Sequence, residues 1–244
     1  MRPLSSAELL HAWEQGLSEP ASRRAVALLA AACPEVSGET VAAWSIGERD
    51  SRLLTLREWT FGSRLLSVAN CSACGERLEW TVKASELHVA GKDKPPAELS
   101  LEFDQYAVSF RLPNSKDLAG IAECDDASAA RKFLLEGCVA AARLGDQEIK
   151  PEDLPTEVVN AIVEQMAEAD PQGDVRIDLQ CPACGHRWDS IFDIESFFWS
   201  EINAWAGRIL GEVHILASAY GWRESDILNL SPQRRHFYLG LVGG

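Results

Sequence analysis

The chain has 244 residues, of which 46% are hydrophobic and 25% charged, with a formal net charge of −14 at pH 7. Its length suits one large domain or two small ones, and its apolar fraction can build a hydrophobic core. The negative charge argues against binding along a nucleic-acid backbone and favours basic protein partners. The sequence lacks a signal-peptide pattern and any apolar run of the ~18 residues typical of a membrane span, so we expect a cytoplasmic protein with reduced cysteines.

Residues 1–63 are predicted to form a helical region. Residues 5–32 have the spacing and break points of two helices, the first with Ser5-Ser6 as its cap and Glu8 near the capping-box position. A third helical segment begins near residue 37. We interpret residues 46–50, four of which are charged or glycine, as a polar turn. Helical spacing of leucines then resumes over residues 51–59.

The hydrophobic period changes over residues 64–112. Leu78, Trp80 and Val82 alternate with polar residues, which is typical of a half-buried strand. Other short alternating runs follow, so we predict several strands here. Residues 91–96, rich in lysine and proline, are predicted to form a loop.

A C-x-x-C-G motif occurs twice, at residues 71–75 and at residues 181–185. Strand-like residues precede each copy, and a charged segment with a tryptophan follows each. The glycine permits the positive φ of a tight turn, which places two thiolates on one side of the backbone. Two facing turns make a tetrahedral four-sulfur cage, the ligand set of structural zinc. The predicted zinc ligands, for one Zn²⁺ per chain, are Cys71, Cys74, Cys181 and Cys184.

Other interpretations of these cysteines compete with a single zinc site. Two disulfides would require an oxidising compartment, for which the sequence shows no sign. A thioredoxin-like redox pair would open a helix, whereas turn and strand follow each pair here. Two separate zinc ions, each completed by a histidine such as His88 or His186, are a further alternative. A four-cysteine cage has no open coordination position, so the metal argues for architecture and against zinc catalysis.

Residues 113–173 are predicted to form a helical insertion, with helices over residues 129–144 and 155–166, before strand character returns at Val175. About 106 residues therefore separate the two cysteine pairs, and closing such a loop costs roughly 4 kcal/mol of chain entropy. Zinc binding, about 10–16 kcal/mol in zinc-finger peptides, can offset this cost. The metal is expected to link the halves of a split β module.

The C-terminal residues 196–244 are predicted to form a helical hairpin. A helix from Glu195 to Gly221 has an apolar stripe at steps of three and four residues, and shorter helices follow Ser225 and Ser231. This stripe consists of Phe198, Ile202, Trp205, Ile209, Val213, Leu216 and Tyr220.

The stripe is either core packing or a docking face, because this hairpin carries many aromatic residues. Side chains off the stripe are the better candidates for contact with a partner. These candidates are Trp199, Trp222, Arg234 and Arg235.

The rest of the sequence offers no active site. It contains no glycine-rich phosphate loop, no G-x-S-x-G and no H-E-x-x-H, so we expect neither an enzyme nor a small-molecule substrate. Cys33, Cys124 and Cys138 lie in alanine-rich helical sequence and are interpreted as buried small hydrophobic residues rather than ligands. His186 is interpreted as a neighbour of the metal site or a surface residue.

The C-terminal region contains three distinctive stretches: Phe197–Ile202, Ala219–Trp222 after Glu212-Val213-His214, and Ile227–Ser231 followed by two arginines and a tyrosine. With these stretches it resembles the baseplate hub assembly family of contractile-tailed phages. Residues 47–54 also resemble larger members from gene clusters of phage-tail-like contractile injection systems. The two cysteine pairs depart from the short phage members.

This resemblance implies a non-enzymatic hub assembly factor or component whose partners are baseplate or tail proteins. Such a chain assembles in the cytoplasm and either leaves or stays in the particle. The alternative is a zinc-ribbon regulator or nucleic-acid adaptor, against which the charge of −14 and the lack of a basic stripe argue.

The predicted fold class is α+β, mostly helical. A small split zinc-ribbon-like β module comprises residues 64–112 and 174–195, with a helical insertion over 113–173. Helical regions over residues 1–63 and 196–244 flank it.

Overall fold

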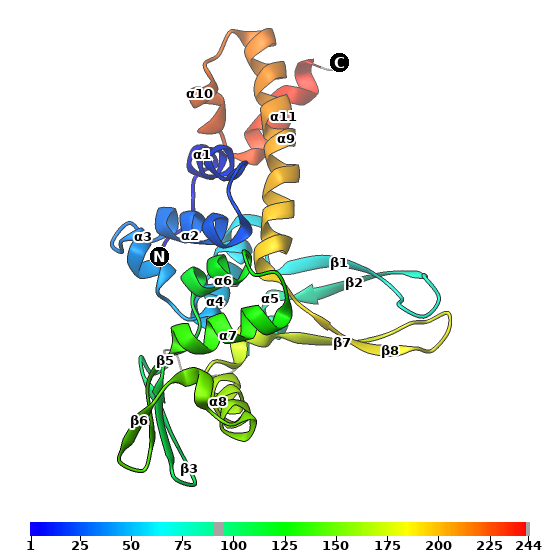
Figure 1. Ribbon diagram of the computed structural model, residues 1–244. Helices are drawn as coiled ribbons and strands as arrows, with labels where there is room; N and C mark the ends of the chain where they lie inside the picture. The colour runs from blue at the N-terminus through cyan, green and yellow to red at the C-terminus, as the bar shows by residue number, and fades with distance from the viewer. Residues whose placement is uncertain (90–94, 243–244) are drawn as a thin grey trace.

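The computed structural model describes residues 1–89 and 95–242 as a mixed α+β protein with small antiparallel sheets. Figure 1 shows an elongated helical body, a lobe at its lower end, and two β-hairpins that project from it side by side. This architecture confirms the predicted α+β, mostly helical class. The predicted loop over residues 91–96 lies, apart from its two prolines, outside the described residues.

Four helices precede the first hairpin and pack with α9 around the largest hydrophobic core. As predicted, Ser5 begins the first helix: its hydroxyl accepts a hydrogen bond from the Glu8 amide, and the Glu8 carboxylate accepts one from the Ser5 amide. Leu29, Leu54 and Phe198 are fully buried in this core. The helices are α1 (Ser6–Gly16), α2 (Ala21–Ala32), α3 (Gly38–Ala42), α4 (Ile46–Phe61) and α9 (Ile194–Tyr220).

Residues 46–50 form the first turns of α4, so their interpretation as a polar turn is wrong. The Ser45 hydroxyl accepts a hydrogen bond from the amide three residues later and caps this helix. Arg49 is buried, and its guanidinium contacts the carboxylates of Asp50 at 2.7 Å and of Glu195 at 3.0 Å. Two of the charges that indicated a turn, Arg49 and Asp50, are therefore partners in an internal ion-pair cluster between α4 and α9.

The cluster predicts how stability depends on pH. Burial raises the pKa of Glu195 from 4.5 to about 7, although Arg49 opposes the shift, and burial likewise raises the pKa of Asp50 to about 6. Between pH 4.5 and 7 the folded state therefore binds more protons at Glu195 than the unfolded state does. The free energy of unfolding should fall as the pH rises through this window.

Replacement of Glu195 with glutamine should flatten that slope, which denaturant unfolding at several pH values measures. The comparison with the unsubstituted protein cancels any pH effect that the variant shares with it. Identical slopes for the two proteins would contradict the assignment.

The segment between the two hairpins forms the lobe in Figure 1. Its sheet has the antiparallel order β3-β4-β5-β6, and α8 covers one face through Val158 and Ile162. Residue 112 is the predicted end of the first part of the β module. The strands before it, β3 and β4, share one sheet with β5 and β6, which lie after it. The elements are β3 (Leu99–Phe103), β4 (Tyr106–Phe110), α6 (Ser115–Ile121), α7 (Ala127–Cys138), β5 (Val139–Leu144), β6 (Gln147–Ile149), η1 (Pro151–Asp153) and α8 (Thr156–Ala169).

The predicted helix over residues 129–144 is correct only as far as Cys138. Its last residues form β5, which pairs with β4 from Tyr106↔Leu144 to Phe110↔Val139. Alanine favours helix in isolation, but here Val139 and Ala142 are buried against the sheet core. Tertiary packing therefore overrides the local preference.

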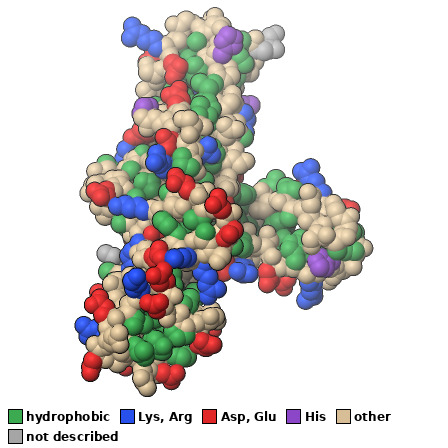
Figure 2. All heavy atoms as spheres, in the orientation of Figure 1, with side chains coloured by type: hydrophobic (Ala, Val, Ile, Leu, Met, Phe, Trp, Pro, Cys, Tyr) green, Lys and Arg blue, Asp and Glu red, His purple; other side chains and the backbone are tan. Residues whose placement is uncertain are grey.

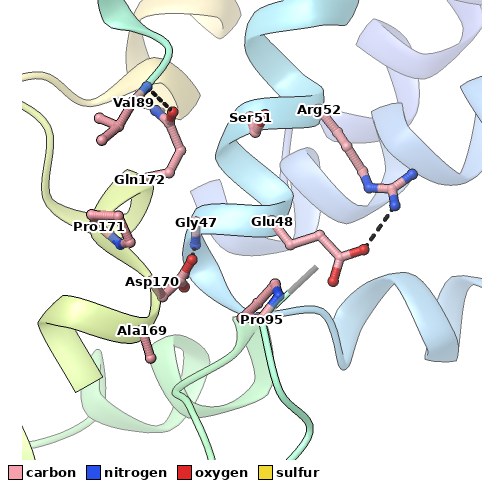
Figure 3. A pocket seen from close by; sticks show the side chains of 10 residues that line it. All are labelled: Gly47, Glu48, Ser51, Arg52, Val89, Pro95, Ala169, Asp170, Pro171 and Gln172. Carbon is pink, nitrogen blue, oxygen red and sulfur yellow. Dashed lines mark hydrogen bonds and ion pairs between the residues drawn. The ribbon is translucent and has the colours of Figure 1, made fainter. Parts of the chain in front are cut away.

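The end of the lobe is tied to the start of α4 by η2 (Pro171–Asp174) and the residue before it (Figure 3). The Asp170 carboxylate accepts a hydrogen bond of 2.8 Å from the Gly47 amide, which is a free donor at a helix N-terminus. A Cβ at Gly47 would collide with that carboxylate, so the contact requires glycine. Gln172 is buried and bonds the backbone of Leu87 and Val89.

The C-terminal helices build the upper part of Figure 1 around a separate core. As predicted, α9 ends at Gly221, whose φ of 67° lies in the left-handed region. Five of the seven predicted stripe residues are buried, whereas Tyr220 is exposed and Trp205 is half-buried. Among the described helices, including this long one, none combines the length and apolar character that crossing a bilayer requires. Two short helices follow, α10 (Glu224–Leu228) and α11 (Pro232–Val242).

Candidate metal centre

The two C-x-x-C-G turns join the strands of two matching hairpins. In each turn the amide of the first cysteine donates to the carbonyl oxygen five residues later at 2.8 Å, and the glycine amide donates back to that cysteine at 2.9 Å. Gly75 and Gly185 have φ values of 77° and 74°, which an L side chain rarely adopts. The repeated motif thus produces the same turn twice. The strands are β1 (Arg64–Asn70), β2 (Arg77–Lys83), β7 (Arg176–Gln180) and β8 (Arg187–Ile191).

The two turns meet at the far end of the projecting hairpins (Figure 1). Their four cysteine Sγ atoms lie within 4.8 Å of one another, although about 106 residues separate the pairs. The Sγ atoms of Cys71 and Cys184 are 3.7 Å apart, and those of Cys74 and Cys181 are 3.6 Å apart. Four sulfurs at about 2.3 Å from a tetrahedral zinc lie about 3.8 Å from each other. The sulfur positions therefore fit a single zinc ion.

The alternatives to one site fit this geometry less well. The sulfur separations across the two turns far exceed the ~2.05 Å of a disulfide, and all seven cysteines are free. Each pair lies in a hairpin turn rather than at the start of a helix, unlike a thioredoxin-type pair. The cluster of potential ligands contains the four cysteines and neither His88 nor His186.

Burial and hydrogen bonding make the four thiols unequal. Burial raises the pKa of Cys71, but hydrogen bonds from the amides of Cys74 and Ala73 outweigh it and lower the pKa to about 7. The Glu76 amide lowers the pKa of Cys74, but the hydrogen bond between Cys74 and Cys184, burial and the other two sulfurs together outweigh it, and the pKa rises to about 12. Neighbouring thiolates repel one another, so the four thiols do not readily ionise together. A bound divalent cation compensates this repulsion and displaces the thiol protons.

Cys71 and Cys181 are buried, whereas Cys74 and Cys184 are exposed. The cage thus has one face toward the two hairpins and one toward solvent. Four protein sulfurs would complete the tetrahedron around a metal, with no position left for a substrate. The arrangement suits a link between two chain segments.

His186 connects the two turns, a contact that the sequence did not reveal. Its Nε2 lies 3.1 Å from the Ser72 hydroxyl of the other turn, and its ring stacks on Trp188 with a centroid distance of 5.7 Å. The sequence showed only that this histidine follows a cysteine turn; the partner lies 114 positions away. We therefore place His186 beside the cage rather than in it.

The three remaining cysteines lie outside the cluster. Cys33 and Cys138 are buried as expected, and Cys124 is half-buried. Burial raises the pKa of Cys33, and it raises that of Cys138 to about 11. Both thiols therefore stay protonated at neutral pH, like small hydrophobic side chains.

The four side chains predicted to contact a partner lie in different surroundings. Trp199 is half-buried, and its ring packs over Gly16, where an added Cβ would collide with it. Trp222 is half-buried and stacks on Tyr220 at a centroid distance of 4.7 Å. Arg234 is exposed on α11.

Arg235 does not face outward as expected. Its buried guanidinium donates to the Glu212 carboxylate at 2.8 Å and to the Leu230 carbonyl oxygen at 2.6 Å, and so joins α11 to α9. A buried charge needs such a partner, which the neighbouring sequence of α11 does not contain.

Comparison with known proteins places these features in a family. A sequence model of the T4 bacteriophage base plate protein family matches residues 8–199. The chain belongs to this family. The match covers the first helices, both cysteine turns and the lobe between them, and it ends within α9. This baseplate family is a structural one and generally non-enzymatic. No curated protein and no solved structure matches the chain.

Proposed function

We propose that the chain is a non-enzymatic component or assembly factor of the baseplate hub of a contractile phage tail or phage-tail-like injection system. The family match over residues 8–199 carries this proposal, because it spans the helical core, the hairpins and the lobe. The C-terminal sequence resemblance to hub assembly proteins gives independent support, since most of it lies beyond residue 199. The partners are other baseplate or tail proteins, and assembly takes place in the cytoplasm.

The proposed role of the metal is structural. One Zn²⁺ held by Cys71, Cys74, Cys181 and Cys184 would join β1-β2 to β7-β8 and so fix both ends of the lobe to the body. This link would hold the hairpin pair at a defined angle to the rest of the molecule. A nucleic-acid adaptor is less consistent with the charge of −14.

Metal analysis of the purified protein is expected to give one zinc per chain. Replacing Cys33, Cys124 and Cys138 together with alanine should leave this content unchanged, because none of them belongs to the cluster. Two zinc ions per chain, or zinc lost from the triple variant, would contradict the single-cage proposal.

Two tryptophan variants separate core packing from partner contact. Trp199→Ala should lower the melting temperature, with a loss of stability below the ~3–5 kcal/mol of a fully buried tryptophan, because its ring packs over α1. Trp222→Ala, at the surface of the C-terminal core, should melt closer to wild type and reduce baseplate assembly.

The measurements are thermal melting and electron microscopy of particles made with each variant. Copurification of baseplate proteins with the wild-type chain tests the proposed function directly. Normal particles formed with Trp222→Ala would show that the surface around Trp222 is not needed for assembly. Failure of every baseplate and tail protein to copurify would count against the proposed role itself.

A further inference from the structure

The lobe contains an apolar groove between α7 and α8. Although α7 has twelve residues and an apolar stripe, Cys138 at its end is its only buried residue. The stripe instead borders a hollow of about 460 Å³ whose other wall is α8. Ala130 and Leu134 line one side, and Val159 and Val163 the other. Leu135 packs against the lobe core, but the part of the apolar face that borders the hollow lacks a packing partner.

The groove lies in the most acidic part of the chain. Residues 97–174 contain 17 aspartate and glutamate residues but only 6 lysine and arginine residues, a net charge of −11 out of −14. Figure 2 shows hydrophobic side chains gathered on this lobe with charged ones around them. Of the basic side chains on the α7 side, Lys132 is paired with Glu136 and Glu152, and Arg131, which lines the groove, donates a hydrogen bond to Asn160 at 2.9 Å. An occupant should therefore be apolar on one face and carry positive rather than negative charge.

The chain itself has a helix with this chemistry. Within α11, Arg235, Tyr238 and Leu239 face the C-terminal core, and the opposite face carries Phe237 and Leu241 one turn apart. The side chains of Phe237 and Leu241 are 65% and 60% exposed. The exposed Arg234 supplies positive charge, whereas Arg235 is buried and paired with Glu212, and the helix has no acidic residue.

The sizes of the two surfaces are compatible. A cavity of about 150 Å³ holds a benzene ring, so the groove has room for the Phe237 ring together with a branched aliphatic side chain. Side chains at i and i+4 are the anchors by which an amphipathic helix binds an apolar groove. Phe237 and Leu241 have this spacing.

These surfaces lie at opposite ends of the molecule, with α11 at the top of Figure 1 and α8 near the bottom. One chain therefore cannot satisfy its own groove. We propose that α11 of one copy docks in the α7–α8 groove of a second copy. This contact joins two different patches, so it either closes as a reciprocal two-fold dimer, with each α11 in the other copy's groove, or extends to a larger ring or an open chain of subunits. The proposal depends on neither the zinc site nor a baseplate partner.

The test is the molar mass of the full, zinc-loaded chain by light scattering, from micromolar to millimolar concentration. The wild-type mass should rise with concentration from that of a monomer to that of a dimer or a larger assembly. Phe237→Asp removes the aromatic anchor of α11. Val163→Asp, at a position 52% exposed, places a charge in the groove, so each variant alone should be monomeric. An equimolar mixture of the two variants should form a dimer and nothing larger. The only intact contact is then between α11 of the Val163→Asp chain and the groove of the Phe237→Asp chain.

Leu66→Asp is the matched control, since Leu66 is 64% exposed on β1 and belongs to neither surface. It should associate like the wild type. A wild-type chain that stays monomeric overturns the proposal and leaves the groove to a basic amphipathic helix of another protein. Association that survives both Phe237→Asp and Val163→Asp, or a mixture that stays monomeric, also overturns it.

Discussion

Cys71→Ser is expected to abolish zinc binding and to cause a broad loss of the folded structure. Zinc binding of about 10–16 kcal/mol in finger peptides is comparable with the whole 5–15 kcal/mol stability of an ordinary domain. Serine would leave the cage with three thiolate ligands and, at the buried fourth position, a hydroxyl that is not among the usual zinc ligands. The contacts that then remain between the two hairpins must hold together segments about 106 residues apart, against a closure entropy of roughly 4 kcal/mol.

The damage should reach beyond the hairpin tips. Leu65 at the base of the first hairpin is fully buried in the largest core, and Val82 and Ile177 pack against it from the neighbouring strands. If the hairpins separate, this part of the core opens to water, with a loss of roughly 25 cal/mol for each Å² of apolar surface exposed. The cage and the helical body are therefore expected to unfold together.

Zinc content and circular dichroism during heating measure this effect. A chelator should reproduce it in the wild-type protein, and added zinc should reverse it there but not in Cys71→Ser. Cys124→Ser is the matched control, because Cys124 is half-buried and lies outside the cluster. A Cys71→Ser protein that keeps its zinc and melts with the wild type would exclude a structural role for the cage.

Local signals in the sequence predicted the features that depend on few residues. The cysteine turns were predictable because spacing and the following glycine define a turn without reference to the rest of the chain. The start of α1 at Ser5 and the end of α9 at Gly221 were predictable for the same reason, since each cap involves neighbours in sequence.

Features that depend on distant partners were not predictable in this way. The charges over residues 46–50 indicated a turn because Glu195, which pairs with Arg49, is far away in the chain. The alanine-rich residues of β5 indicated helix because β4, which fixes them as a strand, is equally remote. Arg235 was expected to be exposed because its partner lies on another helix.

Substitution of the buried Arg57 should strongly destabilise the helical body. Its side chain is 2% exposed and its guanidinium holds the Glu201 carboxylate through two hydrogen bonds, of 2.7 and 2.6 Å. The same group donates to the carbonyl oxygens of Gly62 and Arg64 at 2.6 and 2.8 Å. One side chain thus joins α4, the beginning of the first hairpin and α9.

Arg57→Ala is expected to lower the free energy of unfolding by about 3 kcal/mol. Removing one partner of a buried ion pair usually costs 3–5 kcal/mol, because the other charge stays behind without compensation. The lower end applies here, since Glu201 is 28% exposed and water can solvate part of its charge. Arg57→Lys should recover only part of the lost stability, because an ammonium group cannot reproduce the planar bidentate contact of the guanidinium with the Glu201 carboxylate.

Denaturant unfolding of zinc-loaded protein measures these differences. The matched control is Arg23→Ala, which breaks an exposed pair between Arg23 and Glu19 on the surface of the same helical body. Such a pair contributes about 0.3–0.5 kcal/mol, so the two alanine variants should differ roughly sixfold or more in effect. If Arg57→Ala unfolds at the same denaturant concentration as Arg23→Ala, the guanidinium does not join α4 to α9, and the packing of Leu54 and Phe198 alone must hold them together.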